Sequence, residues 1–356
     1  MPNYSYLRSR KRFNAIDRQR TAEKLLELRK ALDQEIPVRT VDRTLLLATW
    51  NLRDFDSNKF GHGPRLQESY FYIAEIITRF DLIAVQEVNA DIEPLKRLMK
   101  ILGKSWEYIV TDATAGRSGN SERMAFIYDS NKVTFERVAG EIVLPQSKLI
   151  QDKKQFARTP FMVAFRCGWF KFNLCTVHIY YGSDHGEKLT RRIEEIRSLS
   201  SFLGDRAEKE QENYILLGDF NIVSPKHETM KALLDQGFEV PEQIRKPSNI
   251  GRTKYYDQIA FKTQLNELRL GDSEKNAGVF EFFNTVFTDK EFDTYYNKMN
   301  AEIRDYIKPD RPRKEFQKKR YYKVWKTFQI SDHLPMWVEL KIDFSEDYLG
   351  LLAKGY

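Results

Sequence analysis

Two short segments, far apart in the chain, carry the residue types best suited to chemistry. Asp219 and Asn221 follow the apolar run 214–217, while Asp332 and His333 come directly before a second apolar run. If the first run continues as a strand, side chains two residues apart leave on the same face, so the oxygens of Asp219 and Asn221 are expected together. Such oxygens suit hard cations, and an imidazole exchanges protons near neutral pH. These segments together indicate metal-assisted cleavage of a phosphate ester.

Two further apolar runs also end in polar residues. The run 44–50 suits a buried central strand and ends at Asn51, and the run 82–85 ends at Gln86 and Glu87. Functional side chains commonly follow the strands that position them. We therefore expect these residues to join the same site.

Composition limits the classes of protein to consider. The 356 residues can bury a substantial core, and 58 Lys and Arg against 51 Asp and Glu give a net charge of +7, which favours a polyanionic partner. Nine of the basic residues lie within 308–326. Cys167 and Cys175 are too few for a disulfide framework and are expected as buried free thiols, which could face each other across a hairpin. No apolar run reaches membrane-spanning length, so we expect a cytoplasmic protein without a membrane partner, and the sequence indicates no protein partner.

The hydrophobic periodicity mixes strand-like and helix-like segments and predicts two packed sheets flanked by helices. Strands are expected over 44–50, 82–85, 123–128, 134–138, 161–166, 171–179, 214–217, 255–261 and 335–342, and helices over 16–33, 66–79, 92–102, 187–203, 227–234 and 290–307. The predicted divisions are a basic helical extension over 1–43, a catalytic domain over 44–345 that contains a basic, aromatic-rich insertion over 262–330, and a tail over 346–356.

Seven short motifs appear in an order that resembles the endonuclease/exonuclease/phosphatase superfamily, and within it the deoxyribonuclease I branch. The motifs are Trp50-Asn51, Gln86-Glu87, Ser121-Glu122-Arg123, Thr176-Val177-His178, Gly218-Asp219-Phe220-Asn221, Tyr256-Asp257-Gln258-Ile259 and Ser331-Asp332-His333. This resemblance implies a four-layered α/β sandwich, in which helices flank two packed, mainly antiparallel β-sheets, with one active site at the end of the sheets.

The resemblance also implies roles for individual residues. The metal ligands would be Asn51, Glu87 and Asp332, with Mg²⁺ or Mn²⁺ as the ion; the catalytic residues would be His178, His333, Asp219, Asn221, Glu122 and Asp257; and the substrate-binding residues would be Arg158, Asn221 and Tyr180. Glu122 would orient His178, and Asp257 would orient His333. Asp219 and Asn221 would hold the attacking water, the scissile phosphate or a second metal.

Three functions are compatible with the sequence. The favoured one is a divalent-metal-dependent nuclease, with DNA preferred over RNA and in-line attack by water. The second keeps the chemistry but acts on phospholipid headgroups or inositol phosphates, and the third is a non-catalytic nucleic-acid-binding protein. Structural interpretations also compete: Asp219 and Asn221 could cap a turn, Glu122 and Asp257 could form ordinary ion pairs, and the aromatic residues between 282 and 296 are expected to pack rather than stack on bases.

Overall fold

Two β-sheets form the centre of the molecule, which we describe from a computed structural model covering residues 1–114, 121–150, 154–263, 269–305 and 315–355. The six-stranded sheet has the order β10 (Ala277–Val279), β11 (Met336–Lys341), β1 (Thr44–Phe55), β2 (Leu82–Asn89), β4 (Glu122–Asp129) and β3 (Trp106–Val110). The five-stranded sheet has the order β5 (Thr134–Glu141), β6 (Phe161–Cys167), β7 (Phe170–His178), β8 (Tyr214–Asp219) and β9 (Asp257–Lys262). One pair in each sheet, β1–β2 and β7–β8, is parallel, and the other pairs are antiparallel.

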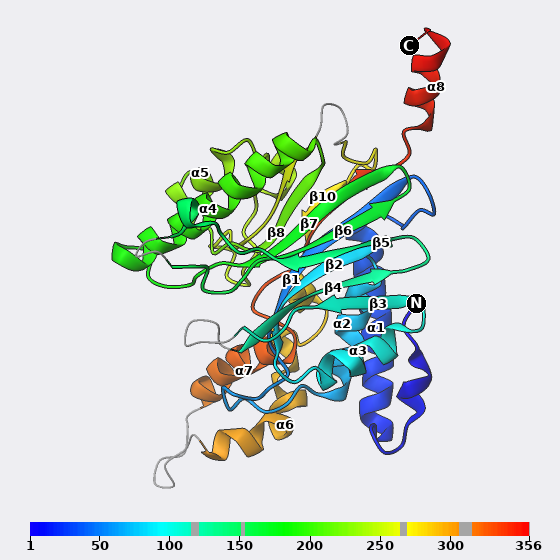
Figure 1. Cartoon of the computed structure of the whole chain (residues 1–356). Coiled ribbons are helices and arrows are strands. Elements are labelled where there is room, and N and C mark those ends of the chain that lie inside the picture. The colour runs from blue at the N-terminus through cyan, green and yellow to red at the C-terminus, as the bar shows by residue number, and fades with distance from the viewer. Residues whose placement is uncertain (115–120, 151–153, 264–268, 306–314, 356) are drawn as a thin grey trace.

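Helices cover the outer face of each sheet, so the architecture has four layers (Figure 1). Helices α1 (Ala15–Glu35), α2 (Gln67–Ile77), α3 (Glu93–Leu102), α6 (Phe292–Asp305) and α7 (Glu315–Gln329) lie on the side of the six-stranded sheet, and α4 (Gly186–Glu210) and α5 (Glu228–Leu234) on the side of the five-stranded sheet. Short 3₁₀ turns occupy Tyr4–Arg8, Gln146–Lys148, Glu242–Ile244, Phe282–Asn284 and Asp289–Glu291. The predicted sandwich of two mainly antiparallel sheets is confirmed.

Strand β1 shows how the sequence specifies these layers. Leu45 and Leu47 belong to the core between the two sheets, whereas Leu46, Ala48 and Trp50 belong to the core beneath α1, α2 and α3. Successive side chains of a strand point to opposite faces, so a strand covered on both sides needs apolar residues at every position. That requirement explains the continuous apolar run at the start of β1.

The N-terminal helix predicted over 16–33 is α1, and it is part of the outer helical layer. Leu25, Leu28 and Leu32 are buried in the same core as α2 and α3. Arg20 also forms an ion pair with Glu68 of α2, with the nitrogen and oxygen 2.7 Å apart. The polar face of α1 is left for solvent, as expected for an amphipathic surface helix.

The insertion predicted over 262–330 folds back on the body of the protein. Its short strand β10 extends the six-stranded sheet beside β11, and α6 and α7 pack together on the outer layer. Phe282, Phe287 and Tyr295 are fully buried, so the expectation that these aromatics serve packing is confirmed. Within the basic stretch 308–326, residues 308–314 lie outside the described residues, and 315–326 belong to α7.

The pairing of β6 with β7 corrects one of the two expectations about the cysteines. Cys167 and Cys175 are both buried free thiols, as predicted. They do not face each other, because the antiparallel register sets Cys175 opposite Met162 and Cys167 opposite Phe170. The pattern alone could not fix this register, since a shift of one residue flips every side chain to the other face.

The C-terminal segment predicted as a tail forms helix α8 (Ser345–Ala353), which extends away from the body (Figure 1). Its side chains are largely exposed to solvent. In the described ranges, no helix combines the length and the apolar character needed to cross a lipid bilayer.

Candidate active site

Strand pairing brings the motif residues from both sheets to one place. In the five-stranded sheet, the parallel β7–β8 register sets His178 opposite Asp219, and the antiparallel β8–β9 register sets Asp219 opposite Asp257. In the six-stranded sheet, Asn51 lies opposite Gln86. The Asn51 side chain reaches across from this sheet to Asp219, with Nδ2 3.1 Å from Oδ2. Residues separated by up to 206 positions are thus in one cluster.

Asp219 occupies the centre of the cluster. Its Oδ2 atom lies 3.6 Å from His178 Nε2 and 3.7 Å from His333 Nε2, in addition to the contact with Asn51. Burial raises the pKa of this carboxyl group, but the charges of His333 and His178 outweigh burial, so the pKa lies below its ordinary value. Asp219 is therefore held as a carboxylate facing two imidazoles.

The glycine before Asp219 permits this close approach. Gly218 has φ of +134°, and a Cβ atom placed on it would lie 2.2 Å from the carbonyl oxygen of Val177. No side chain fits in that space, so β8 approaches β7 closely only because residue 218 is glycine. The consequence is that Asp219 lies directly beside His178.

His333 is oriented by Asp257. Its Nδ1 lies 2.8 Å from Asp257 Oδ2, and the Ser248 hydroxyl donates to the same oxygen at 2.6 Å. The ring also stacks on Tyr256, with centroids 5.4 Å apart. Burial lowers the pKa of the imidazole, but Asp257 and Asp219 outweigh burial and raise the pKa well above its usual value. Burial also raises the pKa of Asp257; because the Ser248 hydroxyl stabilises the carboxylate, we assign the shared proton to His333.

His178 has the corresponding partner in Glu122. The distance from His178 Nδ1 to Glu122 Oε2 is 3.0 Å, close enough for an ion pair, although the ring is not aligned for a hydrogen bond. Arg158 Nε donates to the same oxygen at 2.7 Å, and Lys59 Nζ lies 3.9 Å from Oε1. Burial raises the pKa of Glu122, but the opposing effect of His178, Arg158 and Lys59 is larger. The pKa therefore falls to about 2. Glu122 is therefore a carboxylate at neutral pH.

Glu87 and Asn51 form the oxygen-rich corner of the site. Glu87 has φ of +59°, and its carboxylate accepts from Asn51 Nδ2 at 2.9 Å and from the backbone N–H of Asp54 at 2.8 Å. Asp332 lies apart from this pair: its carboxylate forms an ion pair with Arg53 at 3.1 Å. In the described part of the chain, no three His, Cys, Asp or Glu side chains are gathered as a complete metal site.

The donor chemistry of this corner nonetheless fits a hard divalent cation. Mg²⁺ commonly takes only one or two carboxylates from the protein and completes its shell with water and substrate phosphate. Glu87 supplies such a carboxylate, and Asn51 can add an oxygen once its amide turns, since the nitrogen now faces Glu87 and Asp219. Asp332 could join only after releasing Arg53.

The predicted substrate-binding residues lie in different surroundings. Asn221 is buried beside Asp219: its backbone N–H donates to Asp219 Oδ1 at 3.0 Å and its Nδ2 to the carbonyl of Ile179 at 2.9 Å. Arg158 is also buried, and its Nε is occupied by Glu122. The Tyr180 ring lies beneath the guanidinium of Arg191, 4.3 Å from centroid to Cζ, rather than within the cluster.

Four residues that contact the site were not predicted from the sequence. Asp54 is buried beside Glu87, Ser248 holds Asp257, Arg53 pairs with Asp332, and Lys59 approaches Glu122. Arg53 and Asp54 follow the first motif, Trp50-Asn51, on the same strand. Their closeness to Asn51 in the sequence could therefore have marked them as site residues. Ser248 and Lys59 lie in loops whose paths no local pattern determines.

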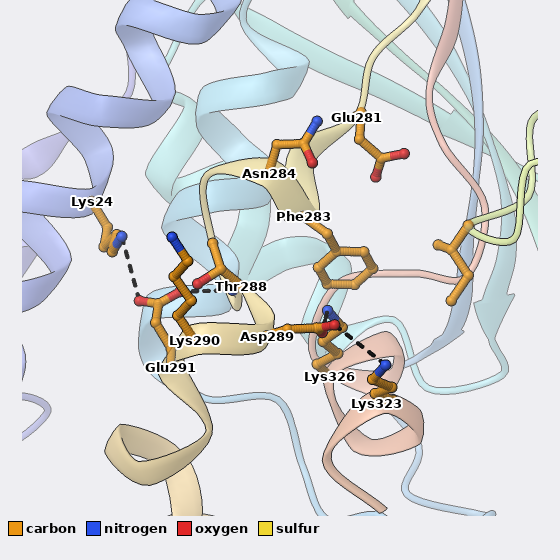
Figure 2. Close-up of a pocket in the computed structure, with 11 residues that line it drawn as sticks. Lys24, Glu281, Phe283, Asn284, Thr288, Asp289, Lys290, Glu291, Lys323 and Lys326 are labelled. Carbon is orange, nitrogen blue, oxygen red and sulfur yellow. Dashed lines mark hydrogen bonds and ion pairs between the residues drawn. The ribbon is translucent and has the colours of Figure 1, made fainter. Parts of the chain in front are cut away.

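A separate pocket of about 700 Å³ lies between the insertion, α1 and α7 (Figure 2). It is lined by Lys24, Ile250, Glu281, Phe283, Asn284, Thr288, Asp289, Lys290, Glu291, Lys323 and Lys326. Most of its charges are paired with each other; Asp289, for example, lies 2.8 Å from Lys326, whose ammonium also lies over the Phe283 ring. Ile250 connects the pocket to the active site, because its backbone N–H donates to the carbonyl of Asp332 at 3.0 Å.

Comparison with known proteins defines the class that this fold and cluster represent. The model of the endonuclease/exonuclease/phosphatase family matches residues 48–294, and the chain therefore belongs to that family. The family contains nucleases and phosphatases, so the coarse prediction of a hydrolase acting on phosphate esters is confirmed. A search of curated proteins found no significant sequence match.

Solved structures show the same fold at low sequence identity. A family protein from Bacteroides thetaiotaomicron is 16% identical, with a TM-score of 0.51, covering 85% of this chain and 99% of that one. A second, from Bacteroides vulgatus, is 11% identical, with a TM-score of 0.52 and coverage of 84% and 99%. The D. rerio TDP2 structure complexed with single strand DNA product is 12% identical, with a TM-score of 0.50 and coverage of 83% and 98%.

Proposed function

We propose that this protein is a divalent-metal-dependent nuclease that hydrolyses phosphodiester bonds, with DNA as its substrate and internal cleavage as its mode. The observation that carries this proposal is the position of Asp219, whose Oδ2 lies within 3.7 Å of two imidazoles and an amide. Each imidazole also has a carboxylate behind it. In-line hydrolysis needs groups of this kind, because water must lose a proton and the departing oxygen must gain one.

The charge states suggest how the residues divide this work. Asp219, as a carboxylate, can accept a hydrogen bond from the attacking water and hold it in line. His333, held as an imidazolium, can donate to the phosphate oxygens as charge develops on them. We assign a proton-transfer role to His178 and a phosphate-orienting role to Asn221. One well-placed acid or base contributes roughly 10²- to 10⁴-fold in rate.

Glu87 and Asn51, with Asp332 after its release from Arg53, would hold Mg²⁺ or Mn²⁺. When bound, the ion neutralises charge on the phosphate oxygens and on the departing oxygen. Glu87 and Asp219 are carboxylates close to the proposed place of the phosphate, and without the ion they would repel a phosphodiester.

DNA is proposed as the substrate for two reasons. The net charge of +7 favours a polyanion, and Arg320 and Lys323 of α7 are exposed. In addition, D. rerio TDP2, which has a similar fold, was solved in complex with a single strand DNA product, and this likeness supports a nucleic acid as the substrate. The expected products carry 5′-phosphate and 3′-hydroxyl ends. We propose a cytoplasmic location, which agrees with two buried free thiols.

The test is cleavage of a substrate panel by the purified chain. Supercoiled plasmid, single-stranded DNA and RNA are incubated with Mg²⁺ or Mn²⁺, with and without EDTA, and compared with the Asp219→Ala, His333→Ala double variant. We expect metal-dependent cleavage of DNA by the wild type and none by the variant. Activity that persists in the variant, or its absence on every nucleic acid with every metal, would contradict the proposal.

A further inference from the structure

The loop between β1 and α2 places an exposed aromatic ring beside the catalytic cluster. The Phe60 side chain is 53% exposed, although it is large and apolar. Its ring packs against Phe328, the last aromatic residue of α7, with centroids 5.7 Å apart. Next to it, His62 stacks on the same Phe328 ring at 4.1 Å. Phe60, His62 and Phe328 form what we call the aromatic ledge.

The loop that carries the ledge is fixed by its own hydrogen bonds. Asn58 accepts at its backbone carbonyl from Gly61 N–H at 3.1 Å, and at its side-chain oxygen from Gly63 N–H at 2.7 Å. Ser57 also donates to Asp54, which contacts Glu87 in the active site. The ring is thus held in position before any ligand arrives, which reduces the entropic cost of binding.

Lys59 connects the ledge to the catalytic cluster. Its ammonium lies 3.7 Å from Asp54 Oδ1 and 3.9 Å from Glu122 Oε1, and 5.2 Å from the centre of the Phe60 ring. The distances of 3.9 Å and 5.2 Å are both measured from Lys59 Nζ. Their sum sets an upper limit of 9.1 Å on the distance from the Phe60 ring centre to Glu122 Oε1. A phosphate bound between the histidines would therefore have a cation and an exposed ring within reach of its neighbouring nucleoside.

A second cation, Arg53, contacts the ledge at Phe328. Arg53 Cζ lies 3.9 Å from the Phe328 ring centre, and Arg53 pairs with Asp332 of the site. Rings flanked by cations are typical of surfaces that bind single-stranded nucleic acid, where bases stack on aromatic faces and cations neutralise the backbone.

We propose that the aromatic ledge binds an unpaired base next to the scissile phosphate, and that the preferred substrate is single-stranded polynucleotide. Phe60 provides the stacking face, Lys59 contacts the adjoining phosphate, and His62 and Phe328 support the ring. The inference rests on the proposed nuclease function and deepens it. Unpaired strands are specified because a base within a duplex is already stacked on both faces.

The test separates binding from cleavage. Wild type, Phe60→Ala and Phe60→Trp are compared by fluorescence anisotropy with a labelled single-stranded oligonucleotide in EDTA, and by KM and kcat for its cleavage with Mg²⁺. Trp169→Ala is the matched control, because Trp169 is 56% exposed but directly precedes β7, whose other end is His178. The same assays are repeated on oligonucleotides with an abasic residue on one or the other side of the only cleavable phosphodiester.

Phe60→Ala should weaken binding and raise KM by roughly 5- to 150-fold, since stacking of one base on an aromatic ring contributes about 1–3 kcal/mol. Phe60→Trp should keep the binding and the KM of the wild type, and Trp169→Ala should change neither quantity. The kcat value should change little in all three variants. The loss should disappear on the substrate that lacks the stacked base, which a purely structural role of Phe60 would not produce. An equal loss on abasic and intact substrates, or no loss in Phe60→Ala, would overturn the ledge.

Two results distinguish the ledge from the nuclease function on which it rests. If the wild type binds single strands with the expected dependence on Phe60 but cleaves none, the nuclease proposal fails and the ledge stands. If the wild type cleaves nucleic acid but Phe60→Ala behaves like Trp169→Ala, only the ledge fails. Absence of both binding and cleavage by the wild type would overturn both.

Discussion

Replacing Glu122 by Gln is expected to destabilise the protein at neutral pH and to slow catalysis. Glu122 is buried, and its Oε2 lies 2.7 Å from Arg158 Nε and 3.0 Å from His178 Nδ1. Its carboxyl pKa is lowered from 4.5 to about 2, because these neighbours outweigh the effect of burial. The amide of Gln has nearly the same shape but carries no charge, so the substitution isolates the electrostatic contribution.

The size of the effect follows from that pKa difference. Lowering the carboxyl pKa from 4.5 to about 2 corresponds to roughly 3 kcal/mol of stabilisation of the folded state by the ionised form. The folded-state pKa lies below the unfolded one, so this stabilisation is fully present above pH 4.5 and is lost as the pH falls towards about 2. Wild type and Glu122→Gln should therefore differ by roughly 3 kcal/mol at pH 7 and converge in acid.

The assay is urea denaturation at several pH values, together with kcat/KM at pH 7. Asp129→Asn is the matched control. Asp129 is the last residue of β4, the strand that begins with Glu122, and it forms an ion pair with Arg39 at 2.6 Å. The control should keep full activity per folded molecule, whereas Glu122→Gln should lose at least tenfold as His178 loses its carboxylate. Equal unfolding free energies for wild type and Glu122→Gln at pH 7, with parallel pH dependence, would refute the reasoning.

The remaining predictions concern His333 and Gly218. Asp257→Asn should lower kcat/KM by roughly 10- to 150-fold, because a hydrogen bond to a charged group contributes about 1.5–3 kcal/mol; NMR titration should show the His333 pKa falling, and an unchanged pKa would contradict the assignment of the shared proton. Gly218→Ala should destabilise the fold by roughly 3 kcal/mol or more in thermal or urea unfolding, since the added Cβ meets the carbonyl of Val177 at 2.2 Å. Gly140→Ala, with open space around its Cβ, is the control, and equal stability of the two variants would exclude a steric role for Gly218.

Much of the fold could be predicted because long elements carry a clear period. The apolar runs of β1, β2 and β8 and the amphipathic pattern of α1 indicate strands and a helix without any tertiary information. Short elements such as β3 and β10 offer too few residues for a period to emerge.

Helix α7 was hidden for a different reason. Its Lys and Arg residues give the sequence the appearance of a charged stripe, and the buried positions are aromatic. Tyr321, Tyr322, Trp325 and Phe328 nevertheless recur at helical spacing and face the core. Charge obscured a pattern that a count of aromatic positions alone would have found.

The sequence by itself determined which groups were available: acids, amides and imidazoles at the ends of strands whose apolar patterns can be read locally. Only the tertiary structure decided which of them meet. Strand register places His178, Asp219 and Asp257 side by side, whereas Asp332 forms an ion pair with Arg53. The physical reason is that a hydrophobic period fixes the face on which a side chain lies, while its partner depends on register, loop path and charge balance between segments distant in the chain.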